Sequence, residues 1–74
     1  MEKEAATYQI SIEGILDKSY SSRFAGMKIH CFEANGSNFT TMTGRVVDQA
    51  QLLGVLNSLN NYQYPVISVN KISN

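Results

Sequence analysis

The chain lacks the residues that many small domains use to reinforce a thin core. Its 74 residues include one cysteine, Cys31, and one histidine, His30. A disulfide within the chain is therefore excluded, and no Cys/His cluster has the spacing of a zinc site. A domain of this size buries only about 60–65% of the surface of its unfolded chain, so self-association is the remaining means of reinforcement. We expect a homodimer with no cofactor and no metal.

Charge of one sign and long apolar runs are also missing. Six basic and six acidic residues give a net charge of zero. No positive excess is available to neutralise phosphates, so nucleic acid is not an expected partner. No stretch approaches the roughly 20 apolar residues of a membrane span, and residues 1–9 are charged rather than signal-like. These absences favour a cytoplasmic location without a membrane partner.

Hydrophobic patterns predict a single α+β domain over residues 7–74, preceded by a disordered tail over 1–6. From Tyr8 onward apolar and polar residues alternate, which indicates a half-buried strand that ends near 14–16. A short helical turn is expected over 18–25, capped by Asp17 or Ser19 and followed by Gly26. After Pro65 a last strand is expected to turn Ile67 and Val69 inward.

The clearest element is a β-hairpin around Asn35-Gly36. Both central positions of a type I′ turn need positive φ, which Asn and Gly tolerate best. With this pair as the turn, Phe32 opposes Phe39 and the alternation is consistent along both strands. One face is then expected to carry Met27, Ile29, Cys31, Met42 and Val46, and the other Lys28, His30, Thr41, Thr43 and the two phenylalanines.

Asp48 stands where a strand gives way to a helical pattern. Gln51, three residues later, completes the spacing of a capping box, in which the Asp side chain accepts from the helix backbone. The buried stripe is expected to hold Leu52, Leu56 and Leu59, flanked by Leu53 and Val55. The helix should end at Asn60 and Asn61. No second acid, histidine or nucleophile lies near Asp48 in the chain, so we interpret it as a structural cap rather than a general acid or base.

The element order β-β-β-α-β predicts a four-stranded, mainly antiparallel sheet covered on one face by a single helix. The crossover over 39–72 should be right-handed and leave the last strand parallel to the third, with one strand between them. Ten residues over 17–26 are barely enough for a second crossover. We therefore expect an antiparallel meander of the first three strands, with a truncated ferredoxin-like fold as the alternative.

Two surfaces are candidates for contact with another protein. The first is the outer face of the helix, because no charged residue occurs from Gln49 to Asn70. Its side chains are small or polar: Ala50, Gly54, Asn57 and Ser58. Ala50, Gly54 and Ser58 are spaced four apart, which would let another backbone approach closely. A polar surface helix without a partner is the alternative. The second is the Phe32–Phe39 pair on the open sheet face, which could stack nucleic-acid bases but lacks basic neighbours, so a protein partner is favoured.

The remaining reactive side chains point to no catalytic site. His30 could serve as a general base or a pH switch, but a lone histidine among polar residues is typical of a surface. Cys31 is expected to face inward as a small apolar group, because no basic setting would activate its thiol. The glycines form no phosphate-binding loop.

A series of short motifs resembles a family of small uncharacterised bacterial proteins. The most specific is the helix start Val46-x-Asp48-Gln49-Ala50-x-Leu52-x-Gly54, and the similarity covers roughly residues 8–70. Family members often carry tryptophan at the positions of Tyr20 and Arg23, and histidine at the position of Leu53. The resemblance implies a cytoplasmic bacterial protein and brings no established activity.

The sequence thus favours a non-enzymatic, self-associating interaction or regulatory domain. One alternative is a small-molecule-binding module similar to ACT-type regulatory domains, with its ligand held at a subunit interface. A further alternative is an enzyme that uses His30.

Overall fold

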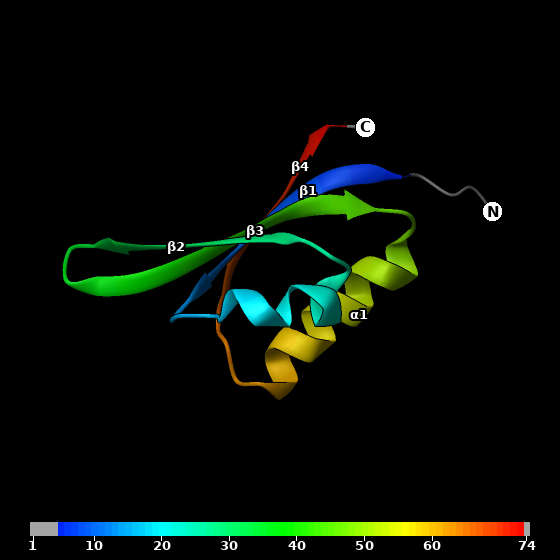
Figure 1. Cartoon of the computed structure of the whole chain (residues 1–74). Helices are drawn as coiled ribbons and strands as arrows, with labels where there is room; N and C mark the ends of the chain where they lie inside the picture. Colours follow the sequence, from blue (N-terminus) through cyan, green and yellow to red (C-terminus); the bar gives the residue numbers. More distant parts are fainter. Residues whose placement is uncertain (1–4, 74) are drawn as a thin grey trace.

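Four strands and two helical segments make up the domain (Figure 1). The computed structural model describes residues 5–73. Along the chain the elements are β1 (Ala6–Glu13), η1 (Lys18–Phe24), β2 (Lys28–Ala34), β3 (Ser37–Val46), α1 (Gln49–Asn61) and β4 (Val66–Ser73). Both helical segments lie below the sheet in Figure 1, so one sheet face is covered and the other is open.

The strand order is β2-β3-β1-β4, and every neighbouring pair is antiparallel. The predicted α+β class, with a four-stranded antiparallel sheet and one main helix, is confirmed. β3 and β4 are parallel with β1 between them, as the crossover predicts. The predicted meander of the first three strands is wrong, because β1 pairs with β3 and not with β2.

The predicted meander is wrong because the connection between β1 and β2 includes more residues than the helical turn alone. It comprises residues 14–27, the fourteen residues between Glu13 and Lys28, which is enough to carry the chain to a parallel strand. Leu16, Phe24 and Met27 anchor this connection in the core with no exposed surface. The result is the strand order of a β-α-β-β-α-β ferredoxin-like path whose first helix is the seven-residue 3-10 helix η1.

The hairpin has the predicted register along its whole paired length. Phe32 opposes Phe39, and pairing runs from Lys28–Thr43 to Ala34–Ser37. Asn35 and Gly36 occupy the turn with φ values of 55° and 80°. In Figure 1 the hairpin tip extends beyond both helical segments, so its last residues have no layer beneath them.

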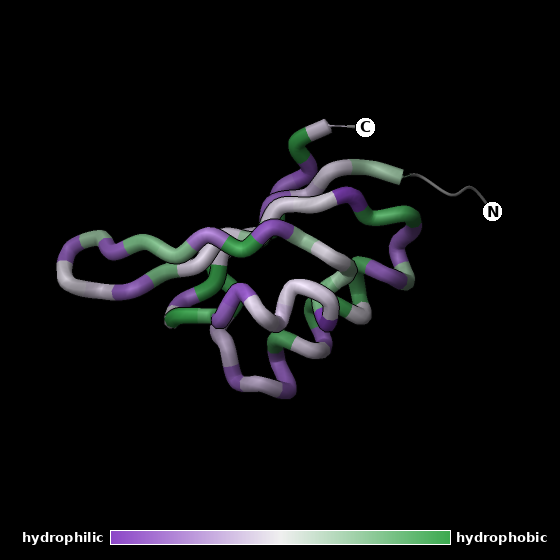
Figure 2. The backbone as a smooth tube through the Cα atoms, viewed as in Figure 1, coloured by the Kyte–Doolittle hydropathy of each residue, from purple (hydrophilic) through white to green (hydrophobic). Residues whose placement is uncertain are grey.

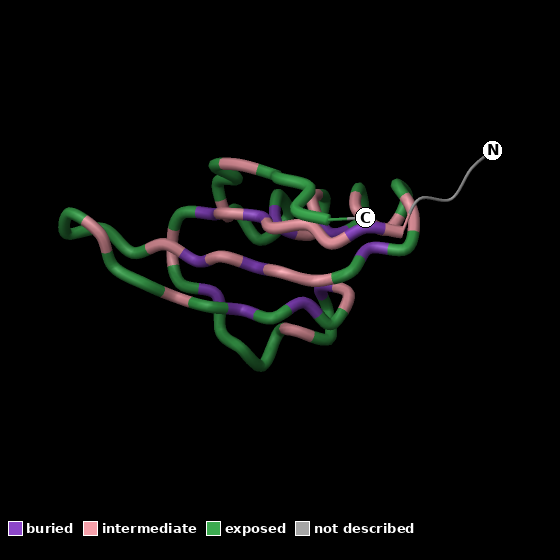
Figure 3. The backbone as a smooth tube through the Cα atoms, turned by 90° about the horizontal axis from the view of Figure 1, so that it is seen from above, coloured by how far each residue is buried: buried purple, intermediate pink, exposed green. Residues whose placement is uncertain are grey.

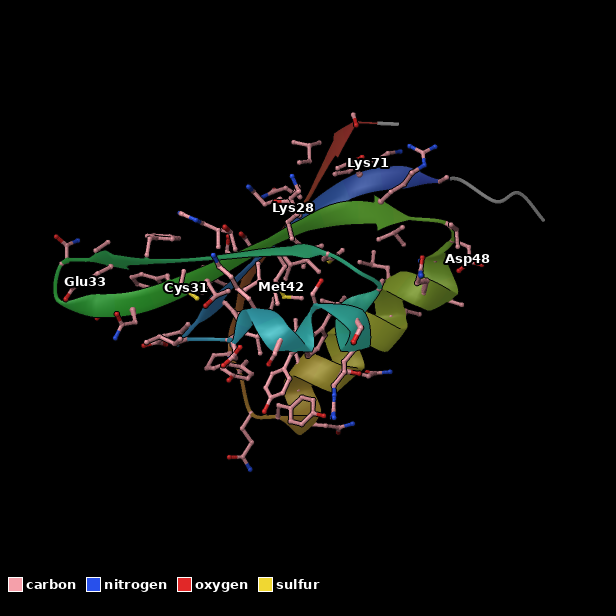
Figure 4. All side chains as sticks on the ribbon, viewed as in Figure 1. Lys28, Cys31, Glu33, Met42, Asp48 and Lys71 are labelled. Carbon is pink, nitrogen blue, oxygen red and sulfur yellow. The ribbon has the colours of Figure 1, made fainter. Side chains whose placement is uncertain are left out.

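The core lies between the sheet and the two helical segments. A close approach of β2 and β3 depends on Gly44, where an added Cβ would lie 2.7 Å from Met27 Cγ and 3.0 Å from Met27 Cα. The core cluster consists of Ile10, Ile12, Leu16, Phe24, Met27, Ile29, Met42, Val46, Val55 and Leu59. Figure 4 shows Met42 below the sheet, on the side of η1.

Asp48 is the N-cap residue of α1, and its side chain accepts a hydrogen bond from Gln51 N at 2.9 Å. Gln51 Oε1 accepts from Val47 N at 2.8 Å, one residue earlier than in a standard capping box. Figure 2 shows apolar residues along α1 with polar residues between them. The expected leucine stripe is displaced, since Val55 and Leu59 are buried and Leu52 and Leu56 only half-buried.

Two boundary predictions need correction. Ala6, assigned to a disordered tail, is the first residue of β1, is fully buried and pairs with Val46; residues 1–4 of that tail, and residue 74, lie outside the described residues. Ile67 and Val69 are not buried as predicted: they are 55% and 38% exposed, although Val69 lies on the helix-covered face opposite Ile10. The core cluster draws on β1, β2, β3, α1 and the segment around η1, whereas β4 contributes no buried residue although α1 contacts it.

Candidate interaction surfaces

The most exposed apolar part of the domain is β4. It pairs with β1 on one side and forms one end of the described sheet. None of its eight residues is buried, although four are aliphatic and expose between 38% and 55% of their surface: Val66, Ile67, Val69 and Ile72. Figure 3 shows β4, which leads to the label C, exposed over nearly its whole length beside the partly buried β1. An exposed apolar edge strand is a template for pairing with another strand.

One flank of α1 extends this apolar surface. Tyr62, at the C-cap of α1, packs against Tyr20 and Phe24 of η1, and η1 lies against β2. At 100° per residue, Leu53 points away from the direction of Tyr62. Leu53 is therefore on the β4 side of the helix, where 52% of its surface is exposed. The apolar surface at this edge thus comes from the strand and the helix together.

The outer face of α1 is the first surface predicted from the sequence. Ala50, Gly54 and Asn57 are exposed, and Ser58 is half-buried on the flank that faces η1. A Cβ added to Gly54 would meet no described atom within 4 Å. The chain itself therefore offers no packing reason for a glycine in the middle of this helix.

The aromatic pair predicted on the open face forms there with a third ring. The centroids of Phe32 and Phe39 lie 5.7 Å apart, and those of His30 and Phe32 lie 6.1 Å apart, both stacked. Phe32 is 40% exposed and Phe39 half-buried. Cross-strand aromatic pairs stabilise a hairpin by roughly 0.5–1.5 kcal/mol. This row of rings therefore has a function within the hairpin, and His30 has an aromatic neighbour rather than a carboxylate.

The rest of the open face is polar. From β1 and β4 it receives Gln9, Ser11, Ser68 and Asn70, since Gln9 opposes Asn70 and Ser11 opposes Ser68. Thr41 and Thr43 continue the same rows onto β3. Figure 4 shows Lys28 above β2, on this side of the sheet. A face of hydroxyl and amide groups offers little apolar area for a protein partner, so the open face is a weaker candidate than the β4 edge.

A small polar network that the sequence does not reveal joins the first connection to the hairpin. Thr40 is fully buried; its hydroxyl donates to Gly14 O at 2.7 Å and accepts from Leu16 N at 3.2 Å. Cys31 Sγ donates to Leu16 O and lies 3.4 Å from Thr40 Oγ1. Cys31 faces inward as expected, but it is half-buried and hydrogen-bonded. The only signal was that Thr40 opposes Cys31 in the predicted register.

Side chains around η1 form an exposed cluster. Tyr20 and Tyr62 stack at 6.1 Å, the Arg23 guanidinium lies 5.5 Å from the Tyr20 centroid, and Arg23 Nη1 donates to Tyr62 OH at 3.0 Å. Asp17 caps η1 by accepting from Ser19 N at 2.8 Å, and this hydrogen bond lowers the pKa of the Asp17 carboxyl below its ordinary 3.8. These contacts hold η1 against the end of α1.

The described part of the chain offers no group of three or more His, Cys, Asp or Glu side chains arranged to hold a metal ion. Within residues 5–73, no helix is long and apolar enough to cross a membrane.

A family model described as a domain of unknown function (DUF8691) matches residues 7–70. The chain belongs to this family. The match covers η1, β2, β3 and α1 completely, all of β1 except Ala6, and β4 up to Asn70, which is nearly the same range as the resemblance in the sequence. Among curated proteins and solved structures, no match to the chain is found.

Proposed function

We propose that this member of the DUF8691 family is a non-enzymatic interaction module that works as a homodimer joined through the β4 edge. The observation that carries the proposal is an eight-residue edge strand with four exposed aliphatic side chains and no buried residue. A standard interface buries about 800 Å² per partner, which is roughly one sixth of the 4918 Å² of accessible surface here. A small domain gains a large fraction of its stability from covering such an area.

Neutrality at this edge favours a second copy over a charged partner. A two-fold interface brings the same patch of both copies together, so a patch with charges of one sign would repel its copy. The helix face and the strand up to Asn70 contain no charged residue, and β4 contributes only Lys71. The single Cys31 also fits the proposed cytoplasmic location in a bacterial cell, because a reducing compartment leaves a lone thiol unpaired.

Light scattering coupled to gel filtration tests the proposal. The parent protein should elute as a dimer at micromolar concentration. Ile72→Lys, at a side chain that is 54% exposed, should give a folded monomer, because the new charge would lie against the apolar edge of the partner. A parent that remains monomeric throughout the concentration range contradicts the proposal.

Matched variants on the other two surfaces identify the interface. Phe39→Lys and Phe32→Lys change the open face, and Gly54→Lys changes the outer face of α1, where a long side chain would block close approach of a second helix. All three should remain dimeric if β4 makes the contact. A dimer lost only in Gly54→Lys would place the interface on the helix instead.

A small-molecule-binding regulatory module of the ACT type is the second candidate. It is favoured by the position of Leu53, because a dimer joined through β4 would bring the exposed Leu53 side of both helices towards the same interface. Thermal unfolding in the presence of each of the common amino acids tests it. A ligand that binds at the dimer interface should raise the Tm of the parent and leave the Tm of monomeric Ile72→Lys unchanged.

A further inference from the structure

We infer that the second copy pairs its β4 antiparallel to the first across a two-fold axis at Val69, so that two four-stranded sheets become one continuous sheet of eight strands. This inference rests on the proposed homodimer and adds its register, from which the position of each residue at the interface follows.

The first step is the backbone of β4. In an antiparallel sheet each strand directs alternate backbone groups to each of its two sides. Among the described residues β4 pairs with β1 alone, so the groups on its other side point outward along the strand. A second β4 running in the opposite direction satisfies those groups on both chains at once, which side-chain contacts alone would not do.

The second step is the face to which each side chain of β4 belongs. Val69 opposes the buried Ile10, so it lies on the helix-covered face. Ser68 opposes Ser11 and Asn70 opposes Gln9, so both lie on the open face. Opposing residues in an antiparallel pair share a face. A continuous sheet therefore requires that one residue of β4 opposes its own copy. In the regular stretch 68–71 this residue is Ser68, Val69 or Asn70, because an axis at Lys71 would bring two like charges together.

The third step is the choice among these three registers. With the axis at Val69, Val69 opposes Val69 of the partner, Val66 opposes Ile72 and Ser68 opposes Asn70, while Ile67 opposes Lys71. With the axis at Asn70, Val69 would oppose Lys71 and Ser68 would oppose Ile72, so no two apolar residues would meet. With the axis at Ser68, Val69 would oppose Ile67, but Val66 would oppose Asn70 and Ile72 would lie beyond the end of the partner's strand. The axis at Val69 therefore pairs the most apolar residues with one another.

Charge and strand shape support the same register. With the axis at Val69 the two Lys71 residues stand four positions apart, roughly 14 Å along the strands; an axis at Asn70 would halve this to about 7 Å, inside the Debye length. The register shifts of β4 against β1 lie on both sides of residues 68–71. The regular stretch of the edge is thus centred between Val69 and Asn70, and with the axis at Val69 the apolar Val66 of one copy opposes Ile72 of the other.

Disulfide cross-linking tests the register. Cys31 is first replaced by Ser, whose hydroxyl can still donate to Leu16 O, and single cysteines are then placed at 68, 69 or 70. Opposing side chains in an antiparallel pair have Cβ atoms about 4.5–5.5 Å apart, close to what a disulfide needs. Val69→Cys should therefore form a covalent dimer about tenfold or more faster than Ser68→Cys or Asn70→Cys under mild oxidation.

The outcomes separate this inference from the proposed function. Faster cross-linking at 68 or 70 would overturn the register while retaining the β4 dimer. A dimer by light scattering with no cross-link at any of the three positions would overturn the β4 pairing. A monomeric Cys31→Ser parent with an unchanged far-ultraviolet circular dichroism spectrum would overturn both.

Discussion

The two edge strands of the sheet differ in how each is covered. β2 has one buried residue, Ile29, which is only 7% exposed because η1 lies against the strand. Its hairpin partner β3 fixes its register. Its exposed positions include Lys28, His30 and Glu33, side chains that discourage pairing with another strand. β4 has exposed aliphatic residues instead and one charge.

The difference shows that the buried core is narrower than the sheet. The core cluster includes residues of β2, β3 and β1 and stops at β1, so β4 stays exposed although α1 contacts it. β2 and β4 each pair with one strand in the described sheet, but β2 carries polar and charged side chains along its edge, whereas β4 has the aliphatic composition of an interior strand. The predictions that follow compare the two edges and the connections that lead to them.

The largest difference is expected between Ile29→Ala and Val69→Ala. Ile29→Ala should lower the free energy of unfolding by about 2–4 kcal/mol, because it leaves a cavity in the core. Val69→Ala should cost less than about 1 kcal/mol in the monomer, since 38% of Val69 is already exposed. Urea unfolding of both variants at a concentration below dimer dissociation measures the contrast.

The same pair should behave in the opposite way on association. Val69 occurs twice across the proposed axis, so its truncation should weaken the dimer by roughly 1–2 kcal/mol, or about tenfold in Kd. Ile29→Ala should leave the Kd of any remaining folded protein within about twofold. Equal effects of Ile29→Ala and Val69→Ala on the Kd would contradict the proposed difference between the β2 and β4 edges.

Two glycines provide the next comparison. Gly44→Ala should destabilise the domain by about 1–3 kcal/mol, because its Cβ would lie 2.7 Å from Met27 Cγ and 3.0 Å from the Met27 backbone. Gly54→Ala should stabilise the monomer by up to about 1 kcal/mol, because nothing lies within 4 Å of the new methyl group. Thermal unfolding of both variants checks the two signs. A Gly54→Ala protein with weakened dimerisation would show that the helix face is in contact with the partner.

A smaller effect is expected at the connection that leads to β4. Asp48→Ala should cost about 1 kcal/mol by removing the acceptor for Gln51 N, whereas Asp48→Asn should cost a few tenths at most, because asparagine caps comparably. Denaturant titration of both variants provides the measurement. Loss of a ligand response in Asp48→Asn with unchanged stability would contradict the structural role of this carboxylate.

The smallest effect is expected at the cap of η1, the connection that leads to β2. The hydrogen bond from Ser19 lowers the pKa of Asp17 below 3.8 in the folded protein, so its contribution to stability is present above pH 3.8 and is lost as the pH falls through the lower folded pKa. Asp17→Asn keeps an acceptor but removes the titration. Unfolding measured from neutral pH to about pH 2 should therefore show a parent–variant difference that is constant near neutrality and changes only below about pH 4.

The parts of the structure that the sequence predicts are those in which neighbours along the chain determine the contact. The register of the hairpin follows from Asn35-Gly36 and alternation, and the Asp48 cap follows from the three-residue spacing to Gln51. The open-face position of Phe32 and Phe39 follows from the same register. In each case the two residues in contact are close to each other in the sequence.

Contacts between distant residues could not be predicted in this way. The choice between a meander and a crossover depended on whether Leu16 and Met27 belong to the connection between β1 and β2. Their burial in the core shows that they do, and this packing could not be read from the sequence. Thr40 fills a buried hydrogen-bonding position created by Gly14 and Leu16, and threonine alone does not signal it. The alternation of residues in β4 predicted that one of its faces is buried. Whether that face is buried depends on how α1 and η1 lie over the sheet, which the sequence of β4 does not determine.

The central position of β1 has a consequence for the order in which the chain can fold. Ile10 pairs with Met42 and with Val69, 32 and 59 positions later. The hairpin and α1 can form from local contacts, but the strand at the middle of the sheet must wait for segments far along the chain, and such distant pairings slow folding. During synthesis, β1 leaves the ribosome first and is paired on both sides only after β4 has followed. Until then the exposed strand edge belongs to β1, so a chaperone that binds nascent chains would meet a different edge from the one that the finished domain presents.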